Sequence, residues 1–182
     1  MRWHVGLGAL IACGITIGCG GRAEGGTART GADEAAVPTA TEAVAAPEFH
    51  LSDLNGKVVS LSDLRGKTVV IDFWATWCPP CVFQVPELNK FWLANKDAGD
   101  VTVIGVAVDA EGARVVAPWV KEQGVQYTIL LGSEKLAKDF GALGFPTLVV
   151  VRPDGKIDSL HVGLIELADL EKLLAVHRSA GG

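Results

Sequence analysis

The sequence predicts one α/β domain whose central sheet is covered by helices on both faces. Two almost unbroken runs of apolar residues, at 68–74 and 101–108, are typical of strands buried on both sides of a sheet. A segment with helical character follows each run, and this alternation is typical of α/β folds. With 182 residues, of which 49% are hydrophobic, the chain is long enough for one domain with its own core.

Local signals predict the other elements in order. Asn55-Gly56 indicates a hairpin turn between two short strands, 62–65 a capped turn, and Pro153-Asp154-Gly155 a second tight turn. Ser133 is typical of a helix N-cap. The expected strands are 49–51, 58–61, 68–74, 101–108, 127–131, 147–151 and 157–162, and the expected helices are 82–95, 113–123, 133–140 and 165–177.

The start of the chain is typical of a secretory signal. Residues 5–18 are apolar and rich in small side chains, and a segment of about 14 residues is too short for a usual membrane span. It ends at Cys19, and this arrangement resembles the lipobox of bacterial lipoproteins, in which the Cys is acylated. Cys13 is the alternative lipidation site. A plain signal peptide without lipid and an uncleaved anchor also remain open.

The chain is therefore expected to have four parts. Residues 1–18 form the signal peptide, 19–46 a flexible tether, 47–178 the folded domain and 179–182 a tail. The tether prediction follows from a Gly-, Ala-, Thr- and Glu-containing composition without hydrophobic periodicity. Each alternative for the N-terminus places the domain outside the cytoplasm of a bacterial cell, and a lipid on Cys19 would anchor it to a membrane.

The charge and the cysteine content of the chain narrow the range of possible functions. The net charge of -5 at pH 7 disfavours binding to nucleic acids or anionic lipid. Of the four cysteines, Cys78 and Cys81 form a Cys-Pro-Pro-Cys motif between a predicted strand and a predicted helix. Such a pair can open and close a small disulfide, and a helix N-terminus stabilises a thiolate.

Metal binding is the main alternative for this motif. A zinc site would need a second cysteine pair or a nearby histidine pair, and His50, His161 and His177 are far apart in the sequence. We therefore expect neither a metal nor any other cofactor; inert structural thiols are a further alternative. Pro79 and Pro80 lack N–H groups, so the Cys81 amide is the chief remaining donor to a Cys78 thiolate. Weak stabilisation of the thiolate favours a reductant.

Several separated motifs resemble the thioredoxin superfamily. They are the run from Val70 to Cys81, Pro86 five residues after the second Cys, and Gly144-Phe145-Pro146-Thr147, which matches the cis-proline loop. Ser60–Lys67 and Arg152–Lys156 are similar to the extracytoplasmic branch that includes TlpA, ResA and CcmG. The likeness spans about residues 47–178. It implies a thioredoxin-like fold with a central mixed sheet and an N-terminal hairpin extension.

The resemblance also implies roles for the residues that carry chemistry. Cys78, expected to be exposed at the helix start, is the attacking thiolate, and Cys81, one turn further and buried, resolves the mixed disulfide. Asp72 interrupts an apolar strand and is expected to take the proton of Cys81. The alternative for Asp72 is a hydrogen-bonded or partly exposed residue at a strand end.

A substrate surface is expected around the motif. Pro146 is a candidate cis-proline, with an ordinary trans turn as the alternative. Phe145, Trp77, Pro79 and Pro80 would form an apolar platform for an extended segment of a partner. For Trp77, plain packing is the alternative.

Gln84 departs from the family pattern. Many TlpA- and ResA-type members carry Glu three residues after the second Cys, where this chain has an amide. Any acid–base role of that Glu cannot be transferred. Asp72 would then act alone, and Gln84 is also compatible with a surface residue.

The resemblance implies a thiol–disulfide oxidoreductase that reduces disulfide-containing proteins, with apocytochromes c as one substrate class and a membrane thiol transporter as electron donor. Among enzymes, the alternative function is that of a disulfide oxidase or isomerase. A peroxiredoxin would have Thr three residues before its reactive Cys, and Thr76 is two residues before Cys78. A lipoprotein that binds a partner or copper(I) without catalysis is the alternative from another class.

Overall fold

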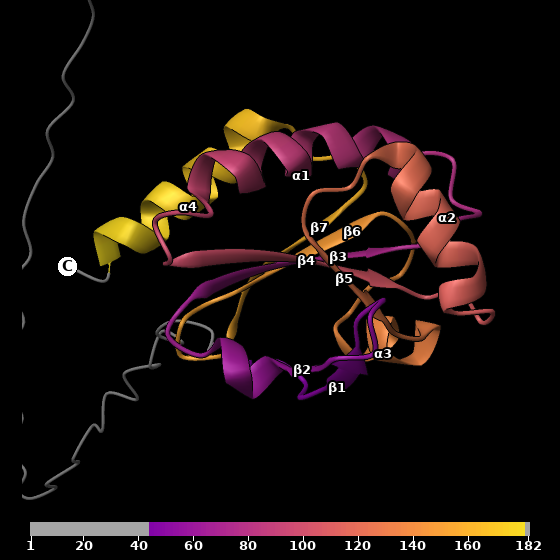
Figure 1. Ribbon diagram of the computed structural model, residues 1–182. Coiled ribbons are helices and arrows are strands. Elements are labelled where there is room, and N and C mark those ends of the chain that lie inside the picture. The colour runs from indigo at the N-terminus through magenta and orange to yellow at the C-terminus, as the bar shows by residue number, and fades with distance from the viewer. Residues whose placement is uncertain (1–43, 181–182) are drawn as a thin grey trace, which may run out of the picture. The chain divides into compact units, whose positions relative to one another are not determined.

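The computed structural model describes residues 44–180, and Figure 1 shows their arrangement. The strands are β1 (His50–Ser52), β2 (Val58–Ser60), β3 (Thr68–Trp74), β4 (Val101–Ala107), β5 (Thr128–Leu131), β6 (Thr147–Val151) and β7 (Ile157–Val162). The helices are η1 (Leu61–Leu64, 3-10), α1 (Cys81–Asn95), α2 (Ala113–Gln123), α3 (Glu134–Asp139) and α4 (Leu167–Ala180).

A mixed sheet of five strands forms the centre of the domain, in the order β5-β4-β3-β6-β7. β3 pairs in parallel with β4 and antiparallel with β6, and β4 pairs in parallel with β5. All seven residues of β3 are buried, as the continuous apolar run predicted. The predicted mixed sheet and N-terminal hairpin, β1–β2, are thereby confirmed.

Helices and the hairpin cover the two faces of this sheet. α1, α2 and α4 lie on one face, with α1 and α4 side by side, and the β1–β2 hairpin, η1 and α3 lie on the other (Figure 1). Aromatic side chains join these layers: Trp74 of β3 stacks on Trp119 of α2 with ring centroids 4.3 Å apart, and Phe73 contacts Phe140 on the opposite side at 5.3 Å. The alternation of side chains along β3 thus supplies a core to both faces.

The ordered pairing begins before the predicted boundary at Pro47. The Ala46 amide donates to the Gly155 carbonyl at 3.0 Å, and the Ile157 amide donates to the Val44 carbonyl at 2.8 Å. Residues 44–46, predicted as the end of the tether, therefore add a short strand-like segment to the β6–β7 hairpin. At the other end α4 continues to Ala180, so the tail predicted to start at residue 179 is wrong by two residues.

The predicted signal peptide, the lipidation candidates Cys13 and Cys19 and most of the predicted tether lie outside the described residues. Across residues 44–180, no helix combines the length and apolar character that crossing a membrane would require.

Four chain segments meet at the edge of the sheet where β3 and β4 end. β3 and β4 run in parallel, so both end at this edge, whereas β6 runs antiparallel to β3 and begins there. The Gly163 amide, just after β7, donates to the Pro146 carbonyl just before β6 at 2.8 Å. Segments distant in sequence therefore meet beside the Cys-Pro-Pro-Cys motif.

Candidate active site

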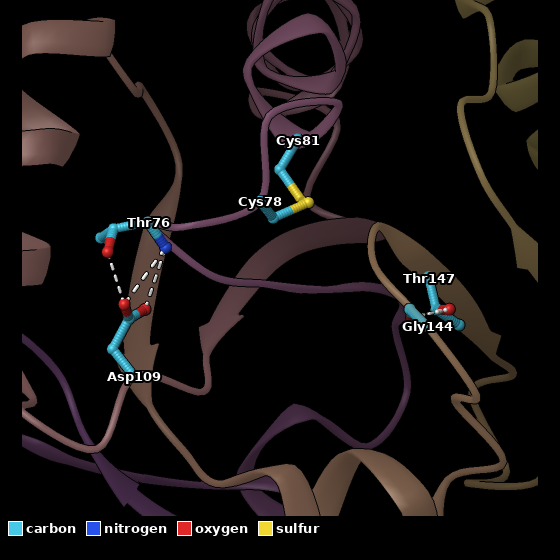
Figure 2. Close-up of a disulfide and its surroundings, with 6 residues drawn as sticks. All are labelled: Thr76, Cys78, Cys81, Asp109, Gly144 and Thr147. Carbon is cyan, nitrogen blue, oxygen red and sulfur yellow. Dashed lines mark hydrogen bonds between the residues drawn. A yellow bond between two sulfur atoms is a disulfide. The ribbon is translucent and has the colours of Figure 1, made fainter.

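Cys78, between β3 and α1, forms a disulfide with Cys81, the first residue of α1 (Figure 2), and their Cα atoms are 5.5 Å apart. The Cys78 amide donates to the Ala75 carbonyl at 3.2 Å, and the Cys81 amide donates to the Cys78 carbonyl at 3.1 Å. Two successive turns therefore carry the motif. In this oxidised form the Cys81 amide bonds to a carbonyl, not to the Cys78 sulfur that the sequence analysis expected it to serve.

α1 begins one residue earlier than predicted, at Cys81, with Pro80 as its N-cap. Cys78 still lies before the helix, in the preceding turn, so the prediction that it lies at the helix start is wrong. Proline fixes φ near the helical value, here -67° at Pro80, and needs no N–H partner, so it is well suited to precede the first helical turn.

Cys78 is 4% exposed and Cys81 is 2% exposed, so the expectation of an exposed Cys78 is wrong for the disulfide form. Cys78 nevertheless lines an apolar groove of about 490 Å³. The groove is also lined by Trp77, Pro79, Pro80, Glu134, Lys138 and the segment Ala142–Phe145. Most of Cys78 is therefore covered by protein, and Cys78 still faces the groove.

Trp77 and Phe145 form the aromatic part of this groove. Trp77 is 58% exposed and meets the Phe145 ring edge-on, with centroids 5.8 Å apart. A Trp side chain so exposed does not fit plain packing, the alternative considered for it. The Phe145–Pro146 peptide bond is cis, as predicted, and the Thr147 hydroxyl donates to the Gly144 carbonyl at 2.7 Å (Figure 2).

Asp72 lies in the middle of β3, between Gly105 of β4 and Leu148 of β6 in the strand register. It is 2% exposed, and its Oδ1 atom is buried without a hydrogen-bond partner. Burial raises the pKa of Asp72 to about 7, because desolvation penalises the charged carboxylate. The alternative of a hydrogen-bonded or partly exposed strand-end residue is therefore wrong, and Asp72 can hold or release a proton near neutral pH.

Tyr127, just before β5, is also affected by this buried carboxyl. Its pKa is raised well above the ordinary value, first by burial and then by the charge of Asp72. The tyrosine therefore stays protonated at neutral pH.

Gln84 is 1% exposed, so its interpretation as a surface residue is wrong. Its Nε2 donates to the Ile165 carbonyl at 3.1 Å, and the Ile165 amide donates to Gln84 Oε1 at 2.9 Å. The side-chain amide thus joins α1 to the segment before α4 in the way a neighbouring strand would. An ionised Glu here could accept from the Ile165 amide but could not donate to its carbonyl.

Asp109 is a site residue that the sequence analysis missed. It follows β4, is 4% exposed, and accepts hydrogen bonds from the amide and the hydroxyl of Thr76, two residues before Cys78 (Figure 2). The only available signal was an acidic residue directly after an apolar strand. Its partner could not be inferred without knowing that β3 and β4 are adjacent and parallel.

Within residues 44–180, no three His, Cys, Asp or Glu side chains come together as ligands for a metal ion. The arrangement has instead the parts that thiol–disulfide exchange needs. It offers a disulfide beside a groove, apolar walls that can hold a partner chain, and a buried carboxyl that titrates near neutral pH.

Comparisons with known proteins agree with this chemistry. The model of the AhpC/TSA family matches residues 43–160. Thiol-disulfide oxidoreductase ResA of Bacillus subtilis is 34% identical over 119 residues, which cover 65% of each chain. ResA of Oceanobacillus iheyensis is 33% identical over 135 residues, covering 71% of this chain and 69% of the relative.

Among solved structures, a thioredoxin-family thiol:disulfide interchange protein from Chlorobium tepidum superposes with a TM-score of 0.66 at 28% identity. The superposition covers 76% of this chain and 98% of that one. The chain therefore belongs to the AhpC/TSA family, has a thioredoxin-like fold and is a thiol–disulfide oxidoreductase with a redox-capable Cys78–Cys81 pair.

Proposed function

We propose that this protein is an extracytoplasmic, membrane-anchored reductant of disulfides in particular partner proteins. The observation that carries this proposal is that Cys78 lines an apolar groove together with Trp77 and Phe145. An apolar groove lined by an exposed Trp and a half-buried Phe suits a protein segment better than a small polar disulfide. Extracytoplasmic location and the lipid on Cys19 rest on the sequence of the first 46 residues.

The exchange proceeds in two balanced steps. In the reduced protein the Cys78 thiolate attacks a partner disulfide, which forms a mixed disulfide and releases one partner thiolate. The Cys81 thiolate then attacks the Cys78 sulfur, which releases the second partner thiolate and leaves the Cys78–Cys81 disulfide. Two electrons pass to the partner, and its two thiolates take up protons. Asp72 receives the proton that Cys81 loses, since its carboxyl has a pKa of about 7.

The direction of electron flow separates this proposal from a disulfide oxidase or isomerase. Pro79 and Pro80 offer no amide to a Cys78 thiolate, and the Cys81 amide is bonded to the Cys78 carbonyl in the oxidised form. A poorly stabilised thiolate makes the dithiol a better reductant. Its own electrons would come from a membrane thiol transporter, and apocytochromes c with oxidised cysteines are one fitting substrate class.

The reduction potential of the isolated domain tests this direction. We expect equilibration with glutathione or dithiothreitol to give a value near that of thioredoxin, about -270 mV. A value near about -120 mV, typical of strong oxidants, would contradict the reductant and support the oxidase. Purified protein that carries stoichiometric copper and fails to reduce insulin would instead support the non-catalytic alternative.

The two cysteines should behave differently in trapping experiments. Because Cys78 lines the groove, Cys81→Ser should accumulate mixed disulfides with partners in the cell envelope, whereas Cys78→Ser should not. Non-reducing electrophoresis of the two variants, expressed at equal levels, measures this difference. Equal trapping by both would show that the attacking and resolving roles are wrongly assigned.

Asp72→Asn should change both stability and exchange. The raised pKa means that folded oxidised protein keeps this proton between about pH 4 and pH 7, where the unfolded chain has lost it. The stabilisation by the neutral carboxyl is full below about pH 4 and is lost as pH rises through about 7. The variant should therefore match the wild type near pH 4 and exceed it at about pH 8 by a few kcal/mol in free energy of unfolding.

Urea unfolding of the oxidised proteins at several pH values measures this effect, and Asp97→Asn, at an exposed carboxyl, is the matched control. In stopped-flow assays Asp72→Asn should also slow resolution of the mixed disulfide at neutral pH. The proton-accepting role of Asp72 would be contradicted by two results together. The free energy of unfolding of Asp72→Asn would vary with pH in parallel with that of the wild type, and its rates of mixed-disulfide resolution would be unchanged from about pH 5 to 9.

Phe145→Ala should weaken docking of protein substrates more than it changes the chemistry of the dithiol. Removing an aromatic side chain from a docking groove is expected to reduce kcat/KM for a protein disulfide by about tenfold. The rate with a small disulfide reagent should stay close to the wild-type value. Phe83→Ala, at an exposed Phe of α1, is the control. Equal loss on both substrates, or none on either, would remove the argument for a docking groove.

A further inference from the structure

Asp109 is a buried acidic side chain two residues after the end of β4, close to the redox-active turn but not part of it. Both of its carboxylate oxygens accept the Thr76 amide, at 3.2 and 3.1 Å, and Oδ1 also accepts the Thr76 hydroxyl. Burying a carboxylate is unfavourable unless donors compensate for the lost water. Here one residue, Thr76, supplies the donors to this carboxylate that the structure records.

Thr76 occupies a sensitive place in the motif. The Cys78 amide donates to the Ala75 carbonyl, so Thr76 and Trp77 are the two central residues of a turn that ends at Cys78. The direction of the Thr76 amide determines how this turn is oriented. A bond that fixes Thr76 therefore fixes where Trp77 and Cys78 lie relative to the cis-proline loop. Figure 2 shows the disulfide between the Thr76–Asp109 contact on one side and the Gly144–Thr147 contact on the other.

Asp109 is held by a rigid part of the fold. β4 is paired with β3 up to Ala107, and the Val108 amide still donates to the Trp74 carbonyl at 3.0 Å. On the other side, the Gly112 amide donates to the Asp109 carbonyl at 3.1 Å. A charged acceptor on such a support makes stronger hydrogen bonds than a neutral one, so it can hold a turn that has few other contacts.

We propose that Asp109 is a positioning residue for thiol–disulfide exchange, which acts through Thr76 to hold the Ala75–Cys78 turn against the substrate groove. Without this contact the turn would move more freely. Cys78 and Trp77 would then be less often aligned with a docked partner disulfide, and the two thiols would meet less often to close their ring. The inference rests on the exchange reaction proposed above and adds a residue outside the motif to it.

Thr76 offers the cleanest test because its side chain can be changed without removing a buried charge. Thr76→Val removes the hydroxyl donor and keeps the shape, whereas Thr76→Ser keeps the donor. Thr128→Val, at an exposed Thr of β5, is the matched control. The assays are kcat and KM for insulin reduction, the equilibrium between disulfide and dithiol in glutathione buffers, and hydrogen exchange at the Thr76 amide.

Thr76→Val should lower kcat/KM for insulin by about tenfold, since misplaced reacting groups lose rate steeply. It should shift the glutathione equilibrium toward the dithiol by about threefold or more, because the two thiols then have a lower effective concentration. The backbone amide of residue 76 should exchange its hydrogen faster in this variant than in the wild type. Thr76→Ser and Thr128→Val should stay within about twofold of the wild type in all three measurements. Asp109→Asn, which keeps one acceptor oxygen, should fall between wild type and Thr76→Val.

Two results would overturn the proposal. One is that Thr76→Val and Asp109→Asn both match the wild type in kcat/KM and in the glutathione equilibrium, even if they melt at a lower temperature, since Thr76→Val alone keeps the backbone amide bond to Asp109. The other is a Thr76→Ser protein that loses as much as Thr76→Val, because the donor would then not be what matters. Trapping by Cys81→Ser is independent of these measurements. Normal trapping, together with Thr76→Val and Asp109→Asn proteins that match the wild type, would remove only the role of Asp109. Failed trapping would remove the exchange scheme itself.

Discussion

The parallel pairing of β3 with β4 is the constraint on which the site depends. It runs in register from Thr68 opposite Val101 to Trp74 opposite Ala107, so both strands end at the same edge. The turn that carries Cys78 leaves from the end of β3, and Asp109 follows the end of β4. β6 enters antiparallel on the other side of β3 and brings Pro146 to the same edge. Central strand pairing therefore brings together the segments around the disulfide, and the contacts between those segments depend on it.

Two buried carboxyl groups near this edge have opposite environments. Asp72 lies among apolar strands, with one oxygen unpartnered, and desolvation raises its pKa to about 7. Asp109 is equally buried, but its oxygens accept an amide and a hydroxyl. A carboxyl without donors can exchange a proton near neutral pH, whereas one satisfied by donors serves as a fixed acceptor. An aspartate side chain is therefore suited to proton transfer at position 72, in β3, and to holding the Thr76 donors at position 109, after β4.

Features that depend on local sequence were predictable, and features that depend on distant contacts were not. The buried strands and the Asn55-Gly56 hairpin followed from runs and motifs of a few residues, and the cis bond before Pro146 followed from the resemblance of residues 144–147 to the cis-proline loop. The burial of Gln84 did not, because its partner, Ile165, is 81 residues away and uses only backbone atoms. No side-chain pattern indicates such a partner. The same reason explains why the pairing of Val44 with Ile157 extended the domain past its predicted start.

Gln84 and Asp72 together explain how a single carboxyl could serve the proton transfer that we propose. The side-chain amide of Gln84 bonds to both the N–H and the C=O of the Ile165 backbone. This pair of hydrogen bonds requires a side chain that can both donate and accept. A carboxylate there would leave the Ile165 carbonyl without a donor in a buried place, which costs about 1–3 kcal/mol. The packing of α1 against the segment before α4 thus favours a neutral side chain one turn after Cys81. Asp72, in β3, has a pKa of about 7 and is the carboxyl that we propose as the proton acceptor.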